Sequence, residues 1–212
     1  MKLRIASLSL LALTLVALPA MAQTVYSNGP INGNTDAWTI NFGFVVSDTF
    51  SVTNNTTITG GSFGMWLFSG DTLTSAELSI TSGENSGTSY FDQTVNFTQG
   101  ACAVNQYGYN VCQENTSFNG PMLNAGSYWL NLQTGSVPSG DPVYWDENSG
   151  PSKASENSVG SIPSEAFTVL GTSTSSMPVT TTTTGSAPEP SSIMLFGSGL
   201  LGLASWLHRK LF

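Results

Sequence analysis

The sequence predicts an all-β protein whose main domain is a single antiparallel β-sandwich, either jelly-roll-like or immunoglobulin-like. Three observations predict this fold between residues 24 and 171: no helical periodicity is sustained, short alternating or β-rich runs recur, and Gly, Asn, Asp and Ser separate the runs. Seven or more short strands with polar turns are typical of a sandwich.

The strands are expected at residues 37–46, 48–53, 57–68, 75–82, 89–98, 127–134 and 165–170. Alternation places Ala76, Leu78 and Ile80 on one face of the fourth run. In the sixth run Tyr128, Leu130 and Leu132 point inward, and Trp129 points to the opposite face. In the last run the same alternation turns Phe167 and Val169 inward. The predicted aromatic core residues are Phe42, Phe44, Phe63, Trp66, Phe68, Tyr128 and Phe167.

Charge is scarce and unevenly placed. The 212 residues have a net charge of −8, and only 8% of them are charged. All 13 acidic residues lie between the two basic ends of the chain, where Lys153 is the only basic residue. Such a region cannot neutralise a phosphate backbone, so nucleic acid is excluded as its partner. The only histidine is His208, which excludes Ser-His-Asp and Cys-His catalysis in the middle region.

Residues 1–22 have the three parts of a secretory signal peptide. Lys2 and Arg4 form a basic start, residues 5–18 are mostly apolar, and Pro19 interrupts them. Ala20 and Ala22 provide the small residues that signal peptidase reads, so we expect cleavage after Ala22. The mature domain, residues 23–171, therefore folds outside the cytoplasm.

The two cysteines, Cys102 and Cys112, predict one disulfide because an exported chain with an even, minimal count pairs them. Gly108 suits the bend of a hairpin or a long loop between them. Closing a loop of this size stabilises a fold by about 3 kcal/mol in the chain-entropy model. The spacing fits neither a metal site nor a redox pair.

A linker and an apolar segment follow the domain. Residues 172–187 contain 11 Ser or Thr among 16 and predict a flexible stalk, either bare or O-glycosylated. Residues 191–207 are uncharged and largely apolar, about 25 Å as a helix, which predicts a single transmembrane helix at the short end of the usual range. The anchor residues are Ile193, Leu195, Phe196, Leu200, Leu201, Leu203, Trp206, Leu207, Arg209 and Lys210, the last two holding the C-terminus inside.

Pro188, Glu189 and Pro190 precede this apolar segment, and a basic cluster closes it. Residues 188–212 therefore resemble the PEP-CTERM sorting signal of Gram-negative bacteria, a tail also labelled "ice-binding protein C-terminal domain", a label that is no sign of ice binding. The resemblance implies that the chain is an exosortase substrate. Exosortase, a membrane protease-transpeptidase, would read the three motif residues and remove the span. The alternative is an anchor that is never cleaved.

The stretch from Gly140 to Asn148 is the most suggestive part of the middle domain. It leaves three interpretations open: an acidic loop with Trp145 tucked into the sandwich edge, a sugar site and a Ca²⁺ site. In the sugar site Tyr144 or Trp145 would stack on the ring, and Asp146 and Glu147 would bind hydroxyls. A glycoside hydrolase is a remote alternative, with Asp141, Asp146 and Glu147 as the available acids.

The sequence thus predicts a non-catalytic, exported surface or extracellular-matrix protein without a resident cofactor, of the kind found in exopolysaccharide-producing biofilm bacteria. Its expected processing partners are signal peptidase and exosortase, and a polysaccharide is the alternative ligand. We expect it to be anchored transiently in the inner membrane with its domain in the periplasm, and then moved to the cell surface or matrix.

Overall fold

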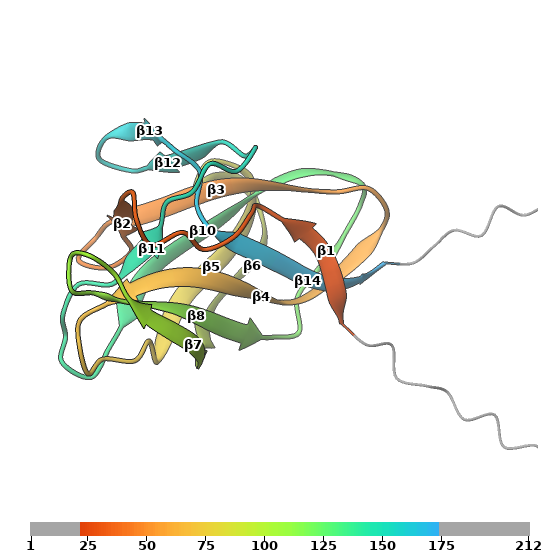
Figure 1. The fold of residues 1–212 in the computed structure, drawn as a ribbon. Helices are drawn as coiled ribbons and strands as arrows, with labels where there is room; N and C mark the ends of the chain where they lie inside the picture. The colour runs from red at the N-terminus through yellow and green to blue at the C-terminus, as the bar shows by residue number, and fades with distance from the viewer. Residues whose placement is uncertain (1–21, 174–212) are drawn as a thin grey trace, which may run out of the picture. The chain divides into compact units, whose positions relative to one another are not determined.

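The computed structural model describes residues 22–173, whose strands form two antiparallel sheets with the hydrophobic core between them (Figure 1). These residues contain no helix. The prediction of an all-β domain with two antiparallel layers is confirmed. The signal segment, most of the linker, the sorting motif and the predicted anchor lie outside the described residues.

Sheet A has eight strands and is built around β4 (Thr56–Leu67). One edge of β4 pairs with β14 and then β11, and the other edge pairs with β9 and then β8. The remaining strands extend these pairs: β1 on β14, β2 on β11 and β7 on β8. Their bounds are β1 Gln23–Ser27, β2 Ala37–Thr39, β7 Thr98–Val104, β8 Asn110–Ser117, β9 Met122–Leu123, β11 Tyr144–Asp146 and β14 Phe167–Ser173.

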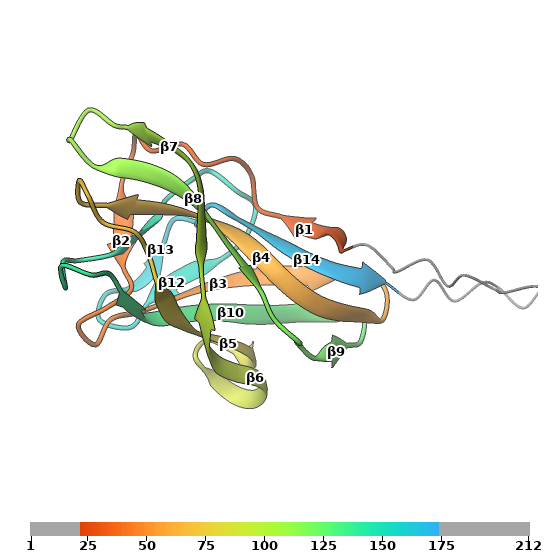
Figure 2. The same ribbon diagram turned by 90° about the horizontal axis from the view of Figure 1, so that it is seen from below.

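Sheet B has six strands in the order β13-β12-β3-β10-β5-β6. Their bounds are β3 Val45–Val52, β5 Ser75–Gly83, β6 Ser86–Asn96, β10 Gly126–Ser136, β12 Ala154–Glu156 and β13 Gly160–Ile162. The β5–β6 hairpin curls at its turn (Figure 2). There the Asn85 amide donates to Asn131 Oδ1 (3.1 Å), and Ser155 donates to Glu84, so the turn is tied to β10 and β12.

The core follows the predicted alternation. The inward side chains of β5, β10 and β14 are buried as expected: Ala76, Leu78 and Ile80; Tyr128, Leu130 and Leu132; Phe167 and Val169. Phe63 and Trp66 are buried as well. The largest completely buried side chain, Trp145, was not among the predicted core residues.

Three predicted core aromatics are exposed, and their prediction was wrong. Phe42 is 66% exposed, Phe44 37% and Phe68 36%. Residues 37–46 are not one strand: β2 ends at Thr39, and Phe42 has a φ of 59° in the turn before β3. Phe68 lies one residue beyond the end of β4. Once a strand ends, its alternation no longer determines where a side chain points.

Glu114 on β8 generates a pH prediction. Its side chain is completely buried, Oε2 has no donor, and burial raises its pKa to about 7, although a hydrogen bond from Gln99 works in the opposite direction. Because the folded pKa is raised, the stability that the protonated acid contributes is present below pH 4.5 and is lost as the pH rises through 7. We expect Glu114→Gln to match the wild type at pH 4 and to exceed its stability by about 3 kcal/mol at pH 8.

Urea unfolding of both proteins at the two pH values measures this difference. A Glu77→Gln variant is the control, because that side chain is only half-buried. Equal stabilities of Glu114→Gln and the wild type at pH 8 would contradict the assignment.

Candidate functional site

The stretch that the sequence singled out forms β11 and the turn after it. Trp145 points into the core, where it is completely buried and packs edge-on against Phe63 and Phe167 at centroid distances of 5.6 and 5.5 Å. Its Nε1 donates to the Ala166 carbonyl (3.0 Å). Of the interpretations left open by the sequence, the one that tucks Trp145 into the sandwich agrees with this burial. Trp145 cannot be the stacking ring of a sugar site, because strand parity turns it inward and leaves Tyr144 on the outer face.

Asp146 is also buried, although it lies on the outer face of sheet A. Oδ1 accepts hydrogen bonds from Trp66 Nε1 (2.6 Å) and the Gly33 amide (2.9 Å), and Oδ2 accepts one from the Asn32 amide (2.8 Å). Burial raises the pKa of Asp146, while these three donors favour its charged form. Asp146 thus holds the loop before β2 against Trp66 and is not free to contact a sugar.

Glu147 has a similar internal role. It is 8% exposed, and its Oε2 accepts a hydrogen bond from Trp38 Nε1 (3.3 Å). Of the four residues proposed for sugar binding, only Tyr144 keeps partial access to solvent. Residues 22–173 contain no group of three His, Cys, Asp or Glu side chains arranged to hold a metal ion, and this includes the acids of the predicted Ca²⁺ loop.

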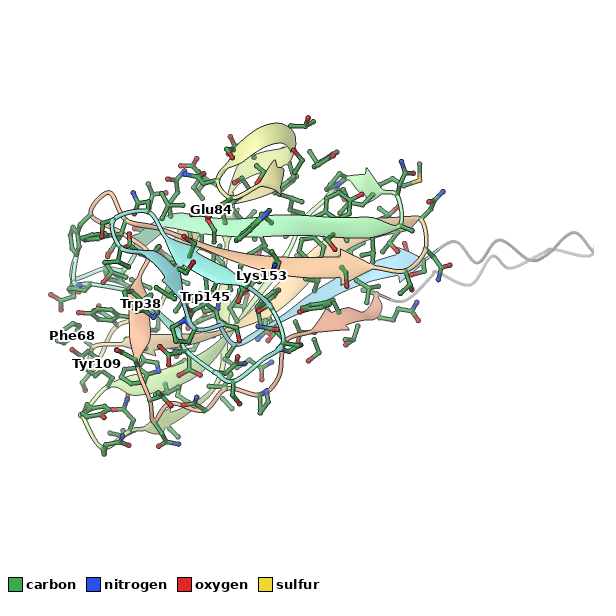
Figure 3. The ribbon with its side chains drawn as sticks, turned by 90° about the horizontal axis from the view of Figure 1, so that it is seen from above. Trp38, Phe68, Glu84, Tyr109, Trp145 and Lys153 are labelled. Carbon is green, nitrogen blue, oxygen red and sulfur yellow. A yellow bond between two sulfur atoms is a disulfide. The ribbon has the colours of Figure 1, made fainter. Side chains whose placement is uncertain are left out.

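A different surface gathers aromatic rings, and we call it the aromatic end: Phe68 and Tyr107 are exposed, Tyr109 and Tyr144 are half-buried, and Trp66 is buried against the two tyrosines of the β7–β8 turn. Tyr107 stacks on Trp66 with a centroid distance of 5.8 Å, and Tyr109 lies 5.7 Å from the same indole. Tyr109 also contacts Phe68 (5.0 Å) and Tyr144 (5.6 Å) edge-on. Figure 3 shows Phe68 and Tyr109 together at one end of the described residues, with Trp145 deeper inside.

The turn between β7 and β8 positions two of these rings. Asn105 Oδ1 accepts hydrogen bonds from the amides of Tyr107 and Tyr109, both at 3.0 Å, and Gly108 adopts a φ of 85° between them. The predicted disulfide between Cys102 and Cys112 is present and joins the two strands of the hairpin. Every residue of β7 is exposed, so no buried side chain of β7 anchors this strand to the core. The disulfide therefore matters, because it ties β7 covalently to β8.

Asp36, Ala37, Trp66, Tyr109 and Tyr144 line a hollow of about 140 Å³ at the aromatic end. Tyr107 is 58% exposed and Phe68 36%, so ring faces remain open to solvent beside it. The pKa of Tyr144 is raised to about 12. Burial is the largest cause, and a hydrogen bond with Tyr109 and nearby charged groups act in the same direction. The Tyr144 hydroxyl therefore remains a hydrogen-bond donor at neutral pH.

Sequence reasoning missed this surface because it assigned Phe68 to the core and gave no role to Tyr107 and Tyr109. The available signal was the pair of tyrosines around a glycine inside a short disulfide loop. Two large aromatic side chains in a tight turn cannot both reach the core, so at least one must face solvent.

A larger hollow of about 560 Å³ runs over the outer face of sheet A. Its lining includes Ser62, Gln113, Asn115 and Thr168, with Leu170 and Ile31 as apolar members. No carboxylate and no exposed aromatic ring line it. This hollow therefore offers neither acid–base chemistry nor a stacking surface.

Comparison with known families places a sorting signal at the end of the chain. Residues 186–210 match the family model of the PEP-CTERM protein-sorting motif. The chain carries a PEP-CTERM motif. The match includes Pro188, Glu189 and Pro190, and extends to Lys210. The motif implies export, association with the membrane and processing by exosortase.

No curated protein matches the chain. Among residues 22–173, no helix could span a membrane, and the predicted anchor lies outside them.

The Asp146 network generates a stability prediction. Asp146→Ala leaves two backbone amides and the Trp66 indole without their acceptor in a buried place. We expect the free energy of unfolding to fall by about 3 kcal/mol, and the Asn32 and Gly33 amides to exchange with solvent much faster.

Urea unfolding and amide hydrogen exchange measure these two effects. Asp92→Ala, on an exposed position of β6, is the matched control and should change stability by less than about 0.5 kcal/mol. If Asp146→Ala behaved like this control, the network would not hold the loop.

Proposed function

We propose that this chain is a non-catalytic surface protein that is exported, anchored briefly in the inner membrane and then cleaved by exosortase for transfer to the cell surface or matrix. The match of residues 186–210 to the PEP-CTERM sorting motif carries this proposal. In it, signal peptidase cleaves after Ala22, residues 191–207 hold the chain in the membrane, and Arg209 and Lys210 remain in the cytoplasm.

Two observations favour a binding role over a catalytic one. Two of the three acids suggested for glycoside hydrolysis, Asp146 and Glu147, are buried and already accept hydrogen bonds from tryptophan indoles. A glycosidase needs two carboxyl groups facing each other across an open cleft. The larger hollow has no acid, and the smaller one has only Asp36.

Replacing Pro188, Glu189 and Pro190 with alanine tests the sorting step. We expect the variant to remain in the inner-membrane fraction at its uncleaved mass, because exosortase no longer recognises it. The wild type should appear at the surface with a shorter C-terminus. Cell fractionation followed by mass spectrometry of the C-terminal peptide provides the readout.

Alanine at Thr181, Thr182 and Thr183 is the matched control, since it changes three residues of the linker outside the motif. This control should be cleaved normally. Normal cleavage and surface delivery of the motif variant would refute the proposed processing.

Carbohydrate binding at the aromatic end is the second candidate function. Exposed aromatic faces beside a few polar groups are the usual composition of sugar sites, because C–H faces of a sugar pack on a ring while hydroxyls bind the polar groups. The rings of Tyr107 and Phe68 are open to solvent, and Tyr144 and Asp36 are among the residues that line the adjacent hollow. The domain has 12 acidic residues and one basic residue between residues 23 and 171, so it favours a neutral polysaccharide over a polyanionic one.

Binding to an array of neutral and uronic-acid polysaccharides tests this second function. The exported chain, purified in mild detergent, should bind a neutral polysaccharide, and Tyr107→Ala should weaken that binding about tenfold through the loss of one stacking ring. Tyr90→Ala is the control, because Tyr90 is also exposed but contacts Tyr128 on sheet B. Absence of binding to every neutral polysaccharide, or equal losses in the two variants, would exclude a sugar site here.

A further inference from the structure

Two acidic side chains, Asp48 and Glu165, are buried in the interior and line neither of the hollows described above. Asp48 lies on β3 in the inward row that also contains Val46 and Phe50, where alternation calls for an apolar residue. Glu165 lies in the segment before β14, and its amide donates to Asp48 Oδ2 (2.7 Å). Both side chains are completely buried. This contact joins the Asp48 carboxylate of sheet B to the backbone of the segment that leads into sheet A, and the Glu165 carboxylate is near enough to Asp48 for the two charges to interact.

The hydrogen bonds around these acids leave three oxygens without a donor. Asp48 Oδ2 accepts from the Glu165 amide and from Asn28 Nδ2 (3.3 Å), but Asp48 Oδ1 and both Glu165 Oε atoms have no partner among the described residues. Lys153, the only basic residue of the domain, is exposed. A buried carboxylate without donors is costly unless a proton or a cation neutralises it.

Like charges increase that cost. Burial raises the pKa of Glu165 well above its ordinary value, and the neighbouring carboxylate of Asp48 raises it further, followed by Glu147, Asp146 and Asp36. Burial raises the pKa of Asp48 to about 7, although hydrogen bonds from the Ser152 side chain and from the amides of Glu165 and Thr49 work in the opposite direction. In an empty interior at least one of the two acids would hold a proton at neutral pH, whereas a divalent cation would allow both to be charged.

Neutral oxygens lie around the Asn28 amide that contacts Asp48. Asn28 Nδ2 donates to Ser152 Oγ and to the Glu165 carbonyl, both at 2.7 Å, as well as to Asp48. These three acceptors are held by the Asn28 amide nitrogen, so an ion would lie beside that nitrogen, against the unpartnered Asp48 Oδ1 and Glu165 side-chain oxygens. Ca²⁺ accepts such a mixture of carboxylate, carbonyl and hydroxyl oxygens and needs no third acidic ligand.

We propose that Asp48 and Glu165 bind a Ca²⁺ ion that links the two sheets. The donor set contains only oxygen, because the described residues have no histidine and their two cysteines form the disulfide. That set excludes a preference for zinc or copper. Mg²⁺ fits less well, because it keeps several waters in a strict octahedron and this site is closed to solvent.

The loop over the site packs too closely to admit bulk solvent. A Cβ added at Gly150 would lie 2.2 Å from the Asn28 carbonyl oxygen, so only glycine allows this approach. Asn148 holds the loop in place by donating to the carbonyls of Asn28 (2.9 Å) and Pro30 (3.3 Å). The ion would therefore be enclosed by residues that are distant in sequence, and its binding would stabilise the folded state.

Thermal unfolding of the exported chain in mild detergent, after treatment with EDTA, tests the proposal. Addition of 5 mM CaCl₂ should raise the melting temperature by about 3 °C or more, and 5 mM MgCl₂ should have a clearly smaller effect. Isothermal titration calorimetry with CaCl₂ should show one site per chain. Both measurements are independent of sorting and of sugar binding.

Glu165→Gln keeps the shape of the side chain and removes its charge, so the calcium shift should be lost. Glu114→Gln is the matched control, since it also neutralises a completely buried acid with an unpartnered oxygen but leaves Asp48 and Glu165 intact. It should keep the full calcium shift. A wild type that responds equally to calcium and magnesium, or not at all, would overturn the proposal, as would a full calcium shift in Glu165→Gln.

Discussion

The structure depends on whether each carboxylate buried in the sandwich has hydrogen-bond donors or another partner for its oxygens. Asp146 shows the satisfied case, in which two amides and an indole N–H surround one carboxylate and hold a loop against sheet A. Asp48 and Glu165 show the other case, in which three carboxylate oxygens are buried without a donor. Because an isolated buried charge is far more expensive than any single packing contact, each acid determines what must lie next to it.

The buried Asp146 carboxylate also fixes the positions of the rings at the aromatic end. Asp146 orients Trp66, Trp66 supports Tyr107 and Tyr109, and the disulfide braces the turn that carries these two tyrosines. The aromatic end lies opposite the end of the described residues where β1 begins and β14 finishes (Figure 1). Rings that are fixed before binding lose little entropy when they contact a ligand, so rigid support suits a recognition surface.

Alternating hydrophobicity predicted the strands whose inward residues form a regular row, such as β5 and β10, and this part of the fold could be found from the sequence. It failed where geometry depends on contacts distant in the chain. The positive φ of Phe42 breaks a run that appears continuous, and the inward turn of Trp145 depends on pairing with β2 and β4. Asp48 resembles an ordinary polar strand residue, because its partner Glu165 lies 117 positions away. The tail could be recognised because its motif is local in sequence.

Anomalous diffraction from crystals of the exported chain grown with CaCl₂ tests the central claim most directly. The account predicts a calcium peak between the two sheets, with carboxylate oxygens of Asp48 and Glu165 about 2.3–2.6 Å from it. An interior without such a peak, with the two side chains in their present places and no ion between them, would contradict the account and leave a proton as the neutralising partner.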